Sequence, residues 1–134
     1  MTPIFADTSF YAACLSPRDS HHAEALALAA KNTSTIITTE FVFVELANLF
    51  SKLARRSAAI RLIHQVRSDS DTLIVPVSSE LLQRGFELYS RRPDKEWSLT
   101  DCISFVVMEE HGVTEALTSD SDFEQAGFVA LLRK

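Results

Sequence analysis

The sequence contains little of what disordered, fibrous or disulfide-stabilised proteins require. Its 134 residues include only three glycines, four prolines and two cysteines. So few glycines and prolines exclude collagen-like, linker-like and intrinsically disordered chains. The two cysteines, Cys14 and Cys102, have apolar neighbours in the sequence. We therefore expect reduced thiols and no disulfide framework.

Long hydrophobic runs are also missing. A membrane-spanning helix needs about 20 consecutive apolar residues. The nearest candidate, residues 41–50, is interrupted by Glu45. The N-terminal residues include no basic stretch and reach an acid at Asp7, which is not the pattern of a signal peptide. Together these absences predict a soluble, cytoplasmic protein without membrane association.

The composition suits one globular domain comprising residues 1–134. Hydrophobic residues make up 46% of the chain, and nine phenylalanines supply much of the core volume. Acidic residues outnumber basic ones by 18 to 13, a net charge of −5. A negative net charge disfavours proteins that hold nucleic acid mainly by phosphate contacts. What matters is therefore where the acids are placed.

Short β-like runs alternate with longer helical segments. We predict strands at 3–6, 35–38, 72–77, 115–118 and 128–132. We predict helices at 8–15, 20–31, 40–53, 57–67, 79–90 and 99–111, with a helical turn at 122–125. This alternation predicts an α/β fold with a mostly parallel sheet covered by helices on both faces.

Periodicity also predicts which helix surfaces are apolar. The helix at 40–53 is hydrophobic almost all round, so we expect it to be buried. In the helix at 20–31, spacings of three and four residues place four apolar side chains on one face: Ala23, Leu26, Ala27 and Ala30.

Several acids occupy positions where parallel α/β sheets hold ligands. Asp7 follows the first predicted strand and Asp120 the fourth. Ligand sites lie beyond the carboxyl ends of strands, at the point where strand order reverses. Each acid also has a purely structural interpretation. Asp7, Asp120 and Asp122 suit helix caps, and Asp101 completes a capping box with Ser98.

Glu45 differs from the other acids because its helix offers little solvent-facing surface. A carboxylate in such a position costs several kcal/mol unless it is paired, hydrogen-bonded or bound to a metal. Arg55 or Arg84 is a possible ion-pair partner, and a narrow polar stripe through Asn48 and Lys52 is another explanation.

Considered together, the acids indicate a cation site. Several carboxylates in one cleft raise one another's pKa unless a cation holds them. Oxygen ligands without His or Cys select a hard ion, Mg²⁺ or Mn²⁺. Such an ion activates water and neutralises charge at a phosphate, so phosphodiester hydrolysis is the natural chemistry.

Four motifs in order make the chain similar to a known family. They lie at residues 7–9, 38–46, 98–105 and 117–128. The first is Asp-Thr-Ser after a hydrophobic strand, and each of the others contains at least one of the acids discussed above. In these features, over nearly its whole length, the chain resembles PIN domain ribonucleases, and in particular the VapC toxins of type II toxin–antitoxin systems.

The resemblance implies a three-layer α/β/α PIN-like fold with a mostly parallel five-stranded sheet. It implies a metal-dependent endoribonuclease that hydrolyses RNA, forms a homodimer and is inhibited by a VapB-like antitoxin. The quartet that would bind Mg²⁺ or Mn²⁺ falls on Asp7, Glu45, Asp101 and Asp120, with Asp122 as an accessory ligand. The hydroxyl positions that would orient these carboxylates fall on Thr8, Ser9 and Thr118.

A basic segment near Trp97 is a candidate RNA contact. Arg91 and Arg92 precede this tryptophan, and together they suit a backbone-binding rim with a stacking platform. Solvated surface positions are the simpler interpretation of both arginines. For the whole chain, the alternative to a nuclease is a non-catalytic PIN-like module that binds RNA or a basic peptide through its acidic pocket.

Overall fold

The computed structural model describes residues 2–133, in which strands and helices alternate as predicted. The strands are β1 (Ile4–Ala6), β2 (Ile36–Thr39), β3 (Thr72–Val75), β4 (Glu115–Leu117) and β5 (Val129–Ala130). The helices are α1 (Thr8–Leu15), α2 (His22–Lys31), α3 (Glu40–Leu49), α4 (Leu53–Ser68), α5 (Ser79–Arg91), α6 (Leu99–Glu110) and α7 (Ser121–Gln125). Each predicted element forms, with ends that differ from the prediction by a few residues.

All five strands pair in parallel, in the order β3-β2-β1-β4-β5. The chain extends the sheet from β1 through β2 to β3, then returns to place β4 on the other side of β1. Strand order therefore reverses between β1 and β4, whose last residues Ala6 and Leu117 are register partners. The residues that follow them, Asp7 and Thr118, consequently emerge side by side at the carboxyl edge of the sheet.

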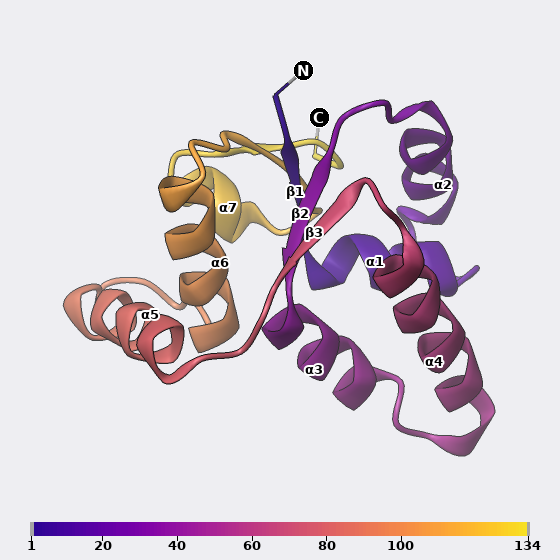
Figure 1. The fold of residues 1–134 in the computed structure, drawn as a ribbon, viewed down its shortest axis with the longest axis horizontal. Coiled ribbons are helices and arrows are strands. Elements are labelled where there is room, and N and C mark those ends of the chain that lie inside the picture. The colour runs from indigo at the N-terminus through magenta and orange to yellow at the C-terminus, as the bar shows by residue number, and fades with distance from the viewer. Residues whose placement is uncertain (1, 134) are drawn as a thin grey trace.

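Helices cover both faces of the sheet and give the three-layer α/β/α arrangement. Figure 1 shows α1, α2 and α4 on one side of the strands and α5, α6 and α7 on the other. The helix α3 begins directly after β2 and contacts α1, α4 and α6. The fold class expected from the sequence is thereby confirmed.

Aromatic rings fix α6 and α7 against the sheet. The ring of Phe123 on α7 lies between Phe5 on β1, at 6.3 Å between centroids, and Phe105 on α6, at 4.9 Å. Phe105 also meets Trp97 edge to face at 5.1 Å. Such edge-to-face pairs contribute about 0.5–1.5 kcal/mol beyond the burial of their area. This stack fixes the start of α6 relative to the start of α7.

A glycine permits close packing between α5 and α6. A Cβ atom on Gly85 would overlap Ile103 Cγ1 and crowd the backbone of Ile103. At the other end of α6, Gly112 adopts a φ of 64°, the left-handed conformation that ends helices. The predicted helix stop at this glycine is confirmed.

Two predictions about helix surfaces are wrong. The helix α3 ends at Leu49 and is not buried all round, because Val44 and Leu49 are each 55% exposed. On α2, the expected apolar face contains Ala23, Leu26, Ala27 and Ala30, and all four are exposed. In their place Ala25 and Leu28 pack against the core. An alanine-rich helix is apolar on several sides, so spacing alone does not select the buried one.

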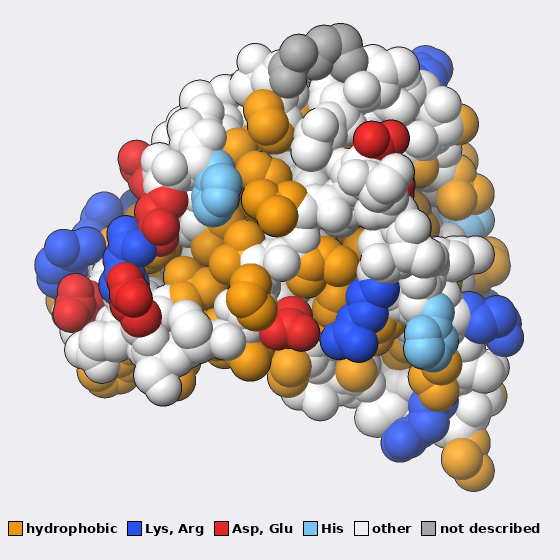
Figure 2. Space-filling view, in the orientation of Figure 1, with side chains coloured by type: hydrophobic (Ala, Val, Ile, Leu, Met, Phe, Trp, Pro, Cys, Tyr) orange, Lys and Arg blue, Asp and Glu red, His pale blue; other side chains and the backbone are white. Residues whose placement is uncertain are grey.

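Hydrophobic side chains are also exposed elsewhere on the surface. Figure 2 shows them gathered across the middle of one face, between α5 and α4. The exposed large hydrophobic residues of α3, α4, α5 and the β3 region are Val44, Leu49, Leu53, Ile60, Leu73, Val77, Leu82, Phe86 and Tyr89. No helix within residues 2–133 combines the length and hydropathy needed to cross a bilayer.

Candidate metal centre

Asp7 is buried at the junction of β1 and α1 and does not cap the helix. It occupies the N-cap position, yet its side chain makes no capping hydrogen bond to α1. Instead its Oδ2 accepts hydrogen bonds from Thr118 Oγ1 at 2.8 Å and Ser9 Oγ at 3.0 Å. Burial, with a smaller contribution from the charge of Glu45, raises the pKa of Asp7 to about 6, and the two hydroxyls oppose this increase.

The two hydroxyls belong to a network that joins the ends of β1 and β4. Ser9 Oγ and Thr118 Oγ1 lie 3.0 Å apart. The Ser119 N–H donates to Ser9 Oγ at 3.1 Å, and the Asp120 N–H donates to Thr118 Oγ1 at 3.0 Å. Thr8 behaves differently, because within residues 2–133 its buried Oγ1 has no hydrogen-bond partner. The carboxylate-orienting role expected of the Thr8 hydroxyl stays a prediction, while the backbone of Thr8 hydrogen-bonds the Asp7 carboxyl and lowers its pKa.

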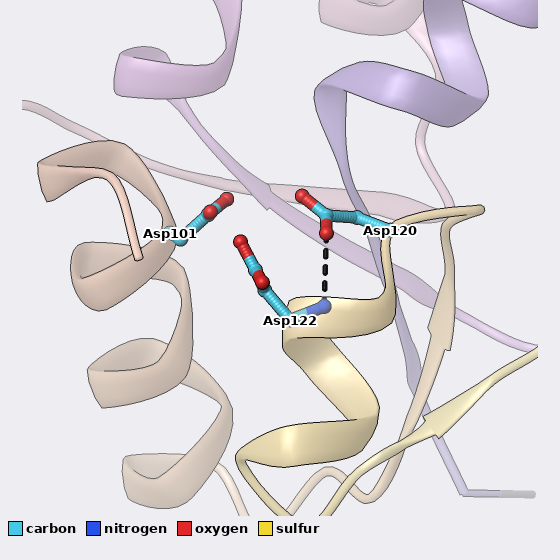
Figure 3. Close-up of side chains that lie close together, drawn as sticks. All are labelled: Asp101, Asp120 and Asp122. Atoms are coloured by element: carbon cyan, nitrogen blue, oxygen red, sulfur yellow. Dashed lines mark hydrogen bonds between the residues drawn. The ribbon is translucent and has the colours of Figure 1, made fainter. Parts of the chain in front are cut away.

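Three aspartates come together where α6 and α7 begin. Asp101, Asp120 and Asp122 each offer one carboxylate oxygen to a group whose members all lie within 4.8 Å of one another. Figure 3 shows these side chains directed into the space between the two helices. The resemblance implies an accessory ligand at Asp122, and this acid lies within the three-aspartate cluster.

Helix capping and clustering coexist at these aspartates. Asp101 and Ser98 form the predicted capping box, in which Ser98 Oγ accepts from the Asp101 N–H at 3.0 Å and Asp101 Oδ2 from the Ser98 N–H at 3.4 Å. Asp120 is the N-cap of α7, and its Oδ1 accepts from the Asp122 N–H at 2.9 Å (Figure 3). These backbone contacts hold two of the three carboxylates in fixed orientations.

The cluster is electrostatically strained in the absence of a cation. Burial and the charges of Asp7 and Asp120 raise the pKa of Asp101 to about 8. Burial and Asp120 also raise the pKa of Asp122. Both shifts have the direction expected when carboxylates crowd together without a balancing positive charge. A hard divalent cation fits this oxygen-only donor set and would relieve the repulsion.

Glu45 lies outside the three-aspartate cluster. It is half-buried on α3, and it acts on Asp7 through charge. Neither proposed arginine pairs with it, since Arg84 pairs with Glu110 and Arg55 lies 4.2 Å from the centre of the Phe50 ring. Asn48 and Lys52 are exposed and Glu45 is half-buried, so the expected solvent-facing polar stripe forms at two of its three positions.

The basic segment is not arranged as expected. Trp97 is 6% exposed, packs against Phe105 and donates its Nε1–H to Gln125 Oε1 at 3.3 Å. Arg92 lies 5.1 Å from the centre of the Trp97 ring and binds both carboxylate oxygens of Asp94. So deeply buried a ring offers little surface to a base, which argues against the stacking role predicted for Trp97. Arg91 is exposed, as an RNA contact requires.

Two polar residues, one on α6 and one on α7, were not among those expected from the sequence. Glu109 and Gln125 line a cavity together with Trp97 and Phe105. Glu109 follows Asp101 by eight residues on α6, and Gln125 follows Asp122 by three on α7. Helical spacing from these acids is the signal that would have indicated both residues.

An all-parallel sheet with acids at its carboxyl edge is typical of α/β proteins that hold a ligand at this edge, and the comparisons with known proteins show the family. Residues 4–129 match the model of the PIN domain, and the chain belongs to this family. It is 32% identical over 126 residues to the 23S rRNA-specific endonuclease VapC20 of Mycobacterium tuberculosis, covering 94% of this chain and 95% of that protein.

Solved structures agree with this assignment. The crystal structure of Mycobacterium tuberculosis VapC20, described as a sarcin-ricin loop cleaving toxin, matches with a TM-score of 0.86 and 31% identity over 94% of this chain and 96% of that chain. FitAcB from Neisseria gonorrhoeae matches with a TM-score of 0.66 and 17% identity over 95% and 94%, a likeness of fold. The similarity to VapC proteins expected from the four motifs is confirmed.

Proposed function

We propose that this protein is a metal-dependent endoribonuclease of the VapC type, which hydrolyses phosphodiester bonds in RNA. The observation that carries the proposal is the crowding of Asp101, Asp120 and Asp122 at the switch point of the sheet. None of the ion pairs in residues 2–133 involves these acids. Keeping unpaired carboxylates this close is costly, and a cation-dependent function accounts for the arrangement.

Asp7, Glu45, Asp101 and Asp120 are the proposed catalytic quartet, and Asp122 joins them as a ligand. When bound, Mg²⁺ or Mn²⁺ would supply an activated water and neutralise charge on the scissile phosphate. Ser9 and Thr118 hold the Asp7 carboxylate toward the site by their 3.0 and 2.8 Å hydrogen bonds. The raised pKa of Asp101 means that a cation must compete with a proton for its carboxylate.

The substrate and partners follow from the same family. The relative's printed name specifies 23S rRNA, and 32% identity along almost the whole chain supports structured RNA, ribosomal RNA included, as the substrate here. We further propose a cytoplasmic location, a VapB-like antitoxin that blocks the acidic pocket, and a homodimer. The exposed hydrophobic residues on α3, α4 and α5 supply a surface suited to such a dimer.

Cleavage of a mixed cellular RNA pool by the purified protein tests the proposal. The reactions contain Mg²⁺ or Mn²⁺, or a chelator, and include the variants Asp7→Asn and Asp101→Asn. Asp69→Asn, at an exposed acid beyond α4, is the matched control. Discrete cuts that require metal and disappear only in the site variants support the nuclease.

The other outcomes contradict the proposal in different ways. A folded protein that binds metal without cutting any RNA would favour the non-catalytic module, which binds RNA or a basic peptide at the same pocket. Cleavage that persists in both site variants would mean that the active site is wrongly assigned.

A further inference from the structure

A second cavity lies beside the metal centre, between α5, α6 and α7. Its volume is about 400 Å³, within the range of small-molecule pockets. Its walls include the half-buried side chains of Leu88 and Phe128, and the buried ring of Phe105 lies beneath them. Arg91 and Glu109 supply charges of opposite sign at its edge.

The cavity and the acidic cluster share two helices. Phe105 follows Asp101 by four residues on α6, and Gln125 follows Asp122 by three residues at the end of α7. At about 1.5 Å per residue, these separations place the cavity roughly one helical turn from the cluster. In Figure 3 the helices α6 and α7 run side by side away from the three aspartates.

We propose that this cavity binds one unstacked guanine of the RNA, next to the phosphate that is cleaved. The inference rests on the proposed nuclease function and adds a base preference to it. Sequence-specific RNA recognition commonly extrudes a base into an aromatic pocket and reads its Watson–Crick edge. Guanine presents two adjacent N–H donors on that edge, and a carboxylate such as Glu109 accepts both.

Charge complementarity distinguishes Arg91 from the other arginines around the cavity. Arg84 pairs with Glu110, and Arg92 pairs with Asp94. Among residues 2–133, no ion pair engages Arg91. Its guanidinium is therefore available to a phosphate that flanks the bound guanine, while Glu109 selects the base.

Binding of short fluorescent oligoribonucleotides tests the proposal without requiring catalysis. The probes are oligouridines with one central guanine, adenine or cytosine, or none, and affinity is measured by anisotropy in chelator. We expect the guanine probe to bind about tenfold more tightly than the others, the discrimination typical of one bidentate contact. Glu109→Gln should remove this preference, whereas Glu115→Gln, at an exposed glutamate on β4, should retain it.

Arg91→Ala should weaken binding of every probe and lower the slope of log affinity against log salt by about one contact. Arg61→Ala, at an exposed arginine of α4, should change neither. Equal binding of all probes to the wild type, or a guanine preference that survives Glu109→Gln, would overturn the inference. If the protein cleaves RNA but shows no guanine preference, only the proposal that this cavity binds guanine is refuted. If it prefers guanine but cleaves no RNA, only the proposed nuclease activity is refuted.

Discussion

Burial and neighbouring carboxylates raise the pKa of Asp101 to about 8, which has consequences for cation binding. At pH 7 the metal-free protein retains this proton, and a cation must displace it. We predict that Mn²⁺ binding releases close to one proton at pH 7 and far fewer at pH 9. Isothermal titration in buffers of different ionisation enthalpy measures this release. Asp101→Asn should abolish it, and equal proton release at both pH values would contradict the prediction.

The same shift determines how stability depends on pH. The folded protein binds more protons than the unfolded chain between the ordinary aspartate pKa of 3.8 and about 8. Stability contributed by the protonated group is therefore present at low pH and lost as the pH rises through this window. We predict that Asp101→Asn raises the Tm of the metal-free protein at pH 8 and leaves it nearly unchanged at pH 4.

Thermal unfolding with and without Mn²⁺ checks this second prediction. Mn²⁺ should raise the Tm of the wild type and have little effect on the variant, because the variant lacks one ligand charge. A lower Tm for Asp101→Asn in metal-free buffer at pH 8 would show that the capping contribution of Asp101 exceeds its electrostatic cost.

The hydroxyl of Thr118 supports two acids at once. It donates to Asp7 Oδ2 at 2.8 Å and accepts from the Asp120 N–H at 3.0 Å. Thr118→Val should lower the free energy of unfolding by about 1–3 kcal/mol and reduce cleavage, because it leaves buried polar groups without partners. Urea unfolding and RNA cleavage measure the two effects. Thr118→Ser keeps the hydroxyl and should recover most of the activity, and a Val variant as active as the wild type would exclude this role.

At the scale of helices, the contact between α5 and α6 depends on Gly85. A methyl group there overlaps Ile103, and overpacking of this kind typically costs about 1–3 kcal/mol. We predict that Gly85→Ala lowers stability in urea unfolding by that amount. In an Ile103→Ala background, which lacks the Cγ1 atom at the contact, Gly85→Ala should cost markedly less. Ser90→Ala, at an exposed position of α5, is the control and should be neutral.

The elements show which features local sequence determines. The Ser98–Asp101 capping box and the stop at Gly112 are local patterns, and both form as predicted. Asp122 joins the cluster because Phe123 packs against Phe105 and brings α7 beside α6, a contact between distant segments. The exposure of Val44 similarly depends on which neighbours α3 meets, and helical periodicity does not contain that information.

For the whole molecule, strand connectivity places the site. The positions of Asp7 and Asp120 after neighbouring strands were predictable, because ligand sites of parallel sheets lie where the strand order reverses. The cavity beside α5 was not predictable, since its walls come from three helices and the segment around Trp97. The burial of Trp97 was not predictable for the same reason, because it depends on contacts with Phe105 and Gln125 from other segments of the chain.

The exposed hydrophobic surface leads to a prediction about assembly. Phe86 and Tyr89 stack at 6.3 Å on the outer side of α5, and both are about half exposed. If this surface joins two copies of the chain, Phe86→Glu should convert a dimer into a monomer because it places a charge in an apolar interface. Light scattering coupled to gel filtration measures the mass. Glu87→Lys, at the adjacent exposed position, should leave the dimer intact.

The central claim is that the clustered aspartates form a metal centre, and anomalous diffraction from crystals grown with Mn²⁺ tests it most directly. We predict an anomalous peak between the carboxylates of Asp101, Asp120 and Asp122, which Asp101→Asn weakens or removes. An acidic cluster without any peak, in crystals where Mn²⁺ binds elsewhere or not at all, would contradict the claim.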